Sequence, residues 1–278
     1  MYQIFYNLTG RAFQLSVNPQ FFYGSTIHKR AISYLRYGLI QGEGFIAITG
    51  PVGTGKSMLV QMLISELEND VIATQIGTTQ LESSDMLRYI AASYHLTYEG
   101  LTKAALLKNL ESFLINQTQR GRRVLLIVDE AQDLPSDSLE ELRLLSNFQI
   151  NGKALLQCFL LGQNELRQIL ALKSMEHLRQ RIIAAYHLSP LGREETQGYI
   201  EHRLKHVGWS KDPVITHDAY QLIYEHTQGI PRRINIFCER LLLHAYTEEL
   251  HTINEDAVKS VIKETSLESF TNESTFSN

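Results

Sequence analysis

The chain has 278 residues, of which 44% are hydrophobic and 20% charged, so it has enough apolar material for a large domain and a smaller one. A net charge of −4 and a pI of about 6.2 exclude the overall basic field that attracts nucleic acid or anionic membranes. Both cysteines lie in apolar segments, which is typical of buried free thiols in a reducing compartment.

The first segment, residues 1–25, is rich in aromatic side chains and is interrupted by turn signals. We interpret it as an N-terminal strap. Two interpretations remain open and compatible: its rings pack on the domain, or its part near Phe22–Gly24 covers an adenine base. We find no basic segment followed by an apolar leader and no apolar run of about 18 residues, so the sequence predicts a cytoplasmic protein.

Helical and strand patterns alternate between residues 25 and 189. Helices are predicted at 25–41, 58–63, 83–94, 103–119 and 138–148, with further helical segments after Gln163. Apolar runs predict strands at 44–49, 71–76, 124–128, 155–161 and 184–188. The run 124–128 is continuously apolar, as in a parallel strand buried on both faces. This alternation predicts an α/β domain over residues 1–189, with ligands at the carboxyl ends of its parallel strands.

Pro190 marks a change of pattern, because only helical periodicity follows it. Helices are predicted at 193–207, 216–227, 231–248 and 254–264. Residues 190–265 are therefore expected to form a small helical domain. Its excess of acidic over basic residues argues against a DNA-binding surface. The remaining residues, 266–278, are rich in Ser, Thr, Asn and Glu and are predicted to be disordered.

A glycine-rich stretch between the first strand and its helix matches G-x-x-x-x-G-K-[ST], the phosphate-binding loop of P-loop proteins. Its glycines allow backbone N–H groups to converge on phosphate oxygens, and the following helix directs its positive end to the same anion. We expect Lys56 to reach the β- and γ-phosphates of ATP and the Ser57 hydroxyl to bind Mg²⁺. The nucleotide-binding residues are expected to be Gly50, Pro51, Val52, Gly53, Thr54, Gly55, Lys56, Ser57 and Met58.

Two acids, Asp129 and Glu130, follow the buried strand 124–128. Carboxylates at a core edge are costly unless something compensates them, and a Mg²⁺ near Ser57 would do so. Because adjacent strand residues point to opposite faces, we expect Asp129 to orient the metal shell and Glu130 to polarise the attacking water. The alternative is that the pair only caps the next helix. Gln163, at the end of the next strand, either senses the γ-phosphate or is an ordinary polar loop residue.

Two arginine pairs are further candidates, because a guanidinium stabilises the charge that develops during phosphoryl transfer. Arg179 and Arg181 precede the last strand. Arg232 and Arg233 follow Pro231, which suits a first helical turn. By composition alone, such pairs are more often a solvated face.

The whole set resembles an AAA+ ATPase with a helical lid. The motifs are Walker A at 50–57, Walker B at 124–130, Gln163, residues 178–182 and residues 229–235. More narrowly, the aromatic opening, Asp129-Glu130-Ala131-Gln132 and the stretch 229–235 are similar to the ExeA/GspA-type secretion ATPases. Within these, the exosortase-associated (PEP-CTERM locus) subfamily is the most similar. The resemblance covers residues 1 to about 264.

This resemblance implies a three-layer P-loop domain, ATP hydrolysis, and roles for three polar residues. Gln163 corresponds to sensor 1 and Arg232 to sensor 2, while Arg181, or Arg179 as the alternative, corresponds to a finger that reaches a neighbour's nucleotide. A homo-oligomer, such as a ring, is implied, together with envelope secretion or polysaccharide-export partners and peripheral association with the inner membrane. The alternatives are a DNA-directed regulator of the TniB transposition-helper type and a nucleotide-dependent scaffold without catalysis.

Overall fold

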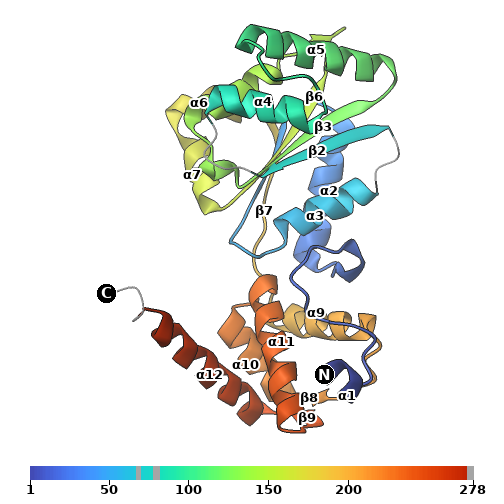
Figure 1. Ribbon diagram of the computed structural model, residues 1–278, viewed down its shortest axis with the longest axis vertical. Helices are drawn as coiled ribbons and strands as arrows, with labels where there is room; N and C mark the ends of the chain where they lie inside the picture. Colours follow the sequence, from blue (N-terminus) through green and yellow to red (C-terminus); the bar gives the residue numbers. More distant parts are fainter. Residues whose placement is uncertain (67–69, 78–81, 274–278) are drawn as a thin grey trace. The chain divides into compact units, whose positions relative to one another are not determined.

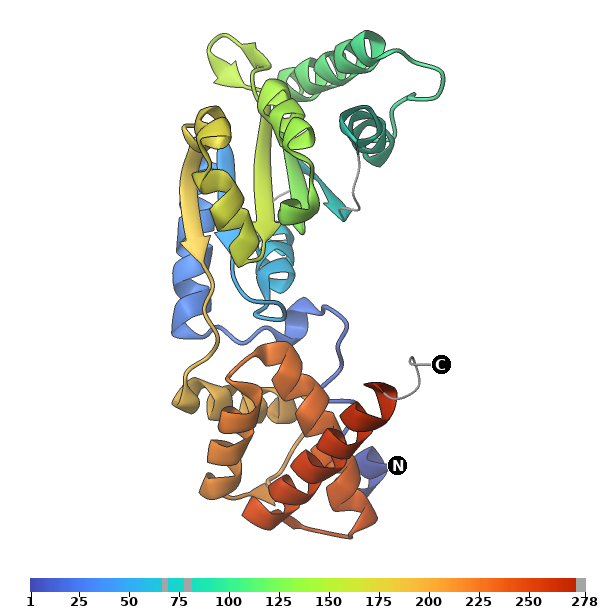
Figure 2. The same ribbon diagram turned by 90° about the vertical axis from the view of Figure 1, so that its left-hand side faces the viewer.

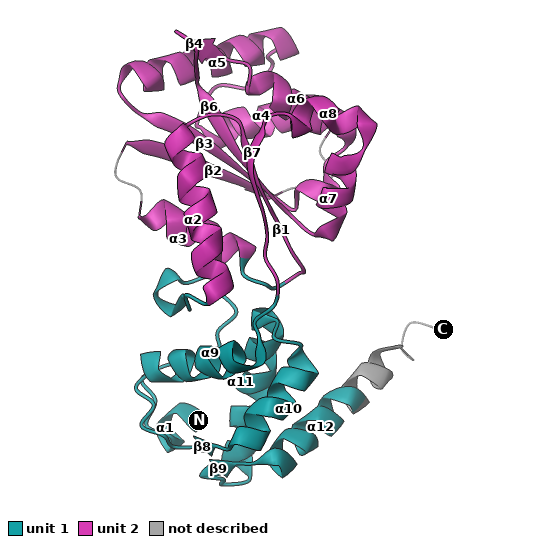
Figure 3. Cartoon of the chain, turned by 180° about the vertical axis from the view of Figure 1, so that it is seen from behind, with its two compact units in different colours: residues 1–25, 53–55, 190–278 teal, residues 26–52, 56–189 magenta. Residues whose placement is uncertain are grey.

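The computed structural model describes residues 1–66, 70–77 and 82–273, with side chains described as far as Ser266. The chain divides into two compact units, coloured in Figure 3. Unit 1 comprises residues 1–25, 53–55 and 190–278, and unit 2 comprises residues 26–52 and 56–189. The division at residue 190 coincides with the predicted change of pattern. The strap 1–25, however, was expected with the α/β domain and belongs to unit 1.

Unit 2 is built on a five-stranded parallel sheet in the order β2-β3-β6-β1-β7. The strands are β1 (Phe45–Thr49), β2 (Val71–Gly77), β3 (Arg123–Asp129), β6 (Leu156–Gly162) and β7 (Ile182–His187). All residues of β1 and β6 are buried, as the continuous apolar runs predict. The predicted parallel α/β class is therefore confirmed.

Helices cover both faces of this sheet (Figures 1 and 2). They are α2 (Thr26–Gln41), α3 (Lys56–Ser65), α4 (Ser83–Ser93), α5 (Lys103–Gln119), α6 (Ser136–Leu145), α7 (Asn164–Ala171) and α8 (Glu176–Arg179). In the core of this unit, the five helices from α4 through α8 pack on the sheet face that carries Phe45, Leu126 and Cys158. On the other face, Gly38 of α2 lies so close to the side chain of Ile46 that a Cβ would overlap it. The alternation of side chains along each strand thus produces a three-layer domain.

Several boundaries in unit 2 differ from the sequence prediction. Helix α6 was expected at 138–148, but it begins directly after Pro135 and ends at Leu145, because a short antiparallel hairpin follows it. That hairpin consists of β4 (Gln149–Ile150) and β5 (Lys153–Ala154). Strand β7 begins at Ile182, two residues before the predicted start. Two 3₁₀ turns also occur, η2 (Ala131–Asp133) and η3 (Lys173–Met175).

Unit 1 consists mainly of helices around its own core. Its elements are α1 (Tyr2–Phe5), η1 (Pro19–Phe21), α9 (Arg193–His206), β8 (Val214–Ile215), α10 (His217–Thr227), α11 (Pro231–Thr247), β9 (Thr252–Ile253) and α12 (Glu255–Glu273). The expectation of helices alone is corrected, because β8 and β9 pair in parallel. Residues 266–278 were predicted to be disordered; helix α12 is assigned as far as Glu273, and residues 274–278 lie outside the described part. No helix among the described residues is long and apolar enough to cross a bilayer.

The N-terminal strap is held in unit 1 by a buried arginine of α9. The Arg203 side chain is only 3% exposed, and its guanidinium donates to the backbone oxygens of Ala12 at 2.6 Å and Gln14 at 3.1 Å. It also lies over the ring of Phe21, 4.7 Å from the centroid. The aromatic rings of the strap thus pack in the core of unit 1 rather than on the α/β domain to which the strap was assigned, while a role of Phe22–Gly24 over adenine stays a prediction.

We expect Arg203→Leu to lower the free energy of unfolding of unit 1 by about 2–4 kcal/mol, because it leaves two backbone carbonyl groups without a buried charged donor. Chemical denaturation followed by tryptophan fluorescence measures this loss, since Trp209 belongs to the same unit. Arg193→Leu, at a half-exposed site on the same helix, is the matched control and should change stability by less than about 0.5 kcal/mol. Equal stability of the two variants would show that Arg203 does not hold the strap.

Candidate nucleotide-binding site

Strands β3, β6 and β1 of unit 2 are adjacent and parallel, so the residues that follow them lie at the same end of the sheet. Gly50 follows β1, Glu130 follows β3 and Gln163 follows β6. The loops are also tied together directly, since the backbone N–H of Gly50 donates to the carbonyl oxygen of Gly162 at 3.2 Å. This carboxyl edge is where the sequence predicts the ligand.

The glycine-rich loop has the backbone that its sequence predicts. Gly53 and Gly55 have φ angles of +81° and +98°, which residues with a Cβ rarely adopt. Lys56 begins α3 and is 6% exposed, and its Nζ donates to the carbonyl oxygens of Gly50 at 2.9 Å and Pro51 at 3.1 Å. Burial lowers the pKa of Lys56, and the nearby Glu130 and Asp129 raise it in part. A curved, donor-rich loop with a lysine at its base suits a phosphate chain.

Ser57 and Asp129 connect this loop to strand β3. The Ser57 hydroxyl donates to Asp129 Oδ2 at 2.9 Å, and Gln75 Nε2 donates to the same oxygen at 3.0 Å. A hydroxyl and a carboxylate side by side fit Mg²⁺, which takes few protein ligands and completes its shell with water and phosphate oxygens. No cluster of three or more His, Cys, Asp or Glu ligands occurs among the described residues.

Glu130 leaves the strand rather than continuing it. It adopts a left-handed conformation with φ of +49°, so strand alternation does not set its direction as we expected. The carboxylates of Asp129 and Glu130 nevertheless have different hydrogen-bond partners. Glu130 Oε2 accepts from Gln132 Nε2 at 2.8 Å and from Gln163 Nε2 at 3.2 Å. The structure therefore brings Glu130 and Gln163 together, and it adds Gln132, which the sequence analysis quoted only as part of a motif.

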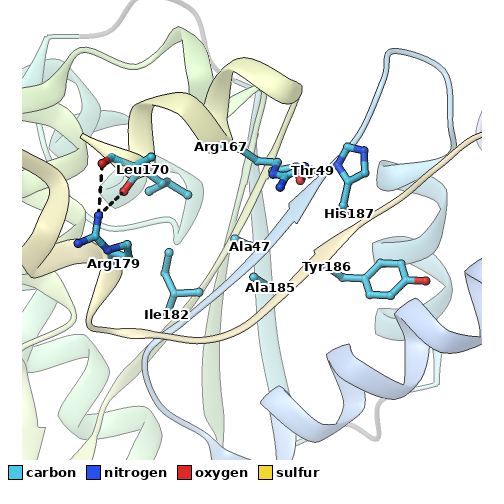
Figure 4. Close-up of a pocket in the computed structure, with 10 residues that line it drawn as sticks. Ala47, Thr49, Arg167, Leu170, Arg179, Ile182, Ala185, Tyr186 and His187 are labelled. Atoms are coloured by element: carbon cyan, nitrogen blue, oxygen red, sulfur yellow. Dashed lines mark hydrogen bonds between the residues drawn. The ribbon is translucent and has the colours of Figure 1, made fainter. Parts of the chain in front are cut away.

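Arg179 and Arg181 lie at the opposite end of the sheet, where the strands begin. They precede the amino end of β7, which runs parallel to β1 with Phe45 opposite Ile182, whereas the glycine-rich loop follows the carboxyl end of β1. Arg181 donates to the backbone oxygen of Ser146 at 3.3 Å and to its hydroxyl at 3.2 Å. Arg179 caps α7 by donating to the oxygens of Leu170 and Ala171 (Figure 4). Neither reaches the Walker A loop of its own chain.

A pocket in unit 2 extends from Arg179 toward the end of β1 (Figure 4). Half of its lining residues are aliphatic, and Arg167 and His187 lie near one end. Thr49 Oγ1 lies 3.1 Å from His187 Nδ1. Burial, followed by the charges of Arg167 and Lys56, lowers the pKa of His187. No local pattern marks Thr49, His187 or Arg167 as a set, because the pairing of β1 with β7 brings His187 beside Thr49 and Arg167 comes from α7.

The stretch 229–235 in unit 1 is largely structural. Gly229 has φ of +67°, and a Cβ there would overlap the backbone oxygen of Leu191. Asn235 is buried and its Oδ1 accepts from the Tyr199 hydroxyl at 2.8 Å. Arg232 and Arg233 are exposed.

Arg232 has one backbone contact that bears on its predicted role. Its backbone N–H donates to the oxygen of Gly53 at 3.1 Å, and both residues belong to unit 1. A Cβ on Gly53 would lie 2.6 Å from the Arg232 Cβ, so the base of this side chain also lies against the loop, while the sensor role predicted for Arg232 remains a prediction.

Comparisons with known proteins agree with these motifs. The profile of the AAA domain family matches residues 39–170. The chain is 37% identical over 254 residues to general secretion pathway protein A of Aeromonas hydrophila. This alignment covers 91% of this chain and 46% of that protein. It is 25% identical over 234 residues to an uncharacterised HTH-type transcriptional regulator of Methanocaldococcus jannaschii, covering 80% of this chain and 56% of the relative. The chain thus spans about half the length of the curated relatives it matches.

Solved structures confirm the fold. The ORC2 protein of Aeropyrum pernix, solved as ADPNP–ADP complexes, matches with a TM-score of 0.69 at 16% identity, over 91% of this chain and 71% of that one. At this level of identity the likeness concerns the fold alone. It agrees with the predicted P-loop domain followed by helices.

Proposed function

Because this chain belongs to the AAA+ proteins of the ExeA/GspA type, we propose that it binds ATP with Mg²⁺ and hydrolyses it to ADP and phosphate. One observation carries this proposal most directly. The Ser57 hydroxyl and the Asp129 carboxylate are joined at 2.9 Å, with Lys56 and Glu130 as their respective chain neighbours. A site of this composition offers a phosphate cradle, two metal ligands and an acid for water activation.

In the proposed reaction the backbone of the loop 50–57 and Lys56 hold the phosphates. Ser57 and Asp129 hold Mg²⁺, which when bound neutralises charge on the phosphate oxygens. Glu130 orients and polarises the attacking water, and Gln163 contacts the γ-phosphate. We assign Arg232 as sensor 2 on the family resemblance alone.

The first experiment measures phosphate release by the purified full chain with and without Mg²⁺. We expect hydrolysis that requires the metal, together with heat on titration of Mg·ATP in a calorimeter. Absence of heat would refute nucleotide binding. Heat without phosphate release would leave a binding protein, which is the scaffold alternative.

We further propose a homo-oligomer that supports envelope secretion, pilus-like or exopolysaccharide export from the cytoplasmic side of the inner membrane. The relation to general secretion pathway protein A supports a secretion-associated role. The TniB-type alternative predicts salt-dependent binding to duplex DNA, which a fluorescence anisotropy titration at two salt concentrations measures.

We propose Arg181 as a finger that acts on the neighbouring subunit, because it lies at the edge of the sheet opposite its own Walker A loop. We expect mixed Arg181→Ala and Lys56→Ala chains to regain hydrolysis that neither variant has alone. In a head-to-tail ring mixed at random in equal amounts, about one interface in four combines an intact Lys56 with an intact Arg181. Arg179→Ala in the same mixture separates the two candidates. No regained activity in assembled mixtures would contradict a finger at Arg181.

A further inference from the structure

Three residues at the edge of the candidate site form a closed set of hydrogen bonds. Gln132 Nε2 donates to Glu130 Oε2 at 2.8 Å, and Gln163 Nε2 donates to the same oxygen at 3.2 Å. Gln132 Oε1 in turn accepts from the backbone N–H of Gln163 at 3.0 Å. Gln132 therefore uses both ends of its amide, one toward the acid after β3 and one toward the loop after β6.

The orientation of the Gln132 amide follows from its partners. An ionised carboxylate only accepts hydrogen bonds, and a backbone N–H only donates them. The amide must therefore direct its nitrogen to Glu130 and its oxygen to Gln163. Exchanging the two ends of the amide would place acceptor against acceptor and donor against donor, so these partners permit one orientation.

The surrounding backbone is shaped to receive this amide. Gln132 lies in the 3₁₀ turn Ala131–Asp133, directly after Glu130 and Ala131. The backbone N–H of Asp133 closes this turn by donating to the backbone carbonyl oxygen of Glu130 at 2.9 Å. At the end of β6, a Cβ on Gly162 would lie 2.8 Å from Gln132 Oε1, so glycine leaves the space that the amide occupies. The contact is thus a feature of two separate loops.

We propose that Gln132 is a positioning residue, which fixes the Glu130 carboxylate against Gln163 so that both keep one geometry relative to the γ-phosphate. This inference rests on the proposed hydrolysis of ATP. Gln132 does not touch the reacting atoms and acts through Glu130 and Gln163. Because Glu130 has a left-handed backbone and follows the strand, side-chain contacts rather than the sheet set the direction of its carboxylate.

We expect Gln132→Ala to lower kcat about 10- to 100-fold, a larger factor than any rise in KM, because misplacement of reacting groups by about 1 Å has such an effect. Gln132→Glu separates the two contacts, since it keeps an acceptor for the Gln163 N–H and replaces the donor to Glu130 by an oxygen. A similar loss of kcat is expected. Gln168→Ala, an exposed glutamine on α7, is the matched control and should leave kcat unchanged.

A double-mutant cycle distinguishes positioning from general damage. If Gln132 and Gln163 act as one unit, the double variant Gln132→Ala/Gln163→Ala loses less kcat than the product of the two single losses. A kcat of Gln132→Ala within about twofold of wild type, or losses that simply multiply, would overturn the inference while leaving the proposed ATPase intact.

Binding measurements test the same contact without hydrolysis. We expect Gln132→Ala to reduce the ratio of the ADP Kd to the ATPγS Kd, because Gln163 loses a partner that holds its loop. If wild type proves unable to hydrolyse ATP, the proposed function fails, and this ratio still decides the inference: an unchanged ratio overturns it, and a reduced ratio supports it.

Discussion

Glu130→Gln is expected to bind Mg·ATP as tightly as the wild-type chain and to hydrolyse it at least about 100-fold more slowly, which is the size of a general-base contribution. The substitution keeps the shape of the side chain and its place beside Gln132 and Gln163. It removes the negative charge that polarises the water. Single-turnover phosphate release measures the rate, and isothermal titration calorimetry measures the affinity.

The matched control for Glu130→Gln is Asp133→Asn, an exposed acid in the same 3₁₀ turn. It makes the same chemical change three residues away and should hydrolyse ATP at the wild-type rate. If Glu130→Gln also kept that rate, Glu130 would not be the water-activating acid, and another group near the Walker B strand would have to be sought.

Lys56→Ala is expected to weaken ATP binding by about 10- to 150-fold, the range for one charge-assisted hydrogen bond. The effect should be large because Lys56 is buried at the base of the loop, with its ammonium group already held by the oxygens of Gly50 and Pro51. Calorimetric titration of Mg·ATP measures the change in Kd. Hydrolysis at subsaturating ATP should fall by at least the same factor.

Loss of Lys56 also leaves the Gly50 and Pro51 oxygens without their donor, so stability must be followed separately. Thermal unfolding without nucleotide reports any such effect on the fold. Lys108→Ala, at an exposed position on α5, is the matched control and should bind ATP as the wild type does. Equal affinity of all three proteins would mean that the glycine-rich loop does not hold the phosphates.

Local sequence determined the parts of this protein that depend on neighbouring residues. The apolar runs, the helical periodicity and the glycine-rich motif predict the parallel sheet, most helices and the residues after each strand. Helix α5 matches its predicted bounds because Thr102 caps it by accepting from the Ala105 N–H. Parallel order then implies that Lys56, Asp129 and Gln163 share one edge.

Tertiary structure alone decided the contacts between residues far apart in the chain. The strap joins α9 through Arg203, Gln132 joins two loops, and His187 lies beside Thr49 because β7 pairs with β1. No periodicity records such pairs, since each residue satisfies its local pattern whichever partner it meets. The end of α6 differs from the prediction for a related reason, because the hairpin of β4 and β5 follows that helix.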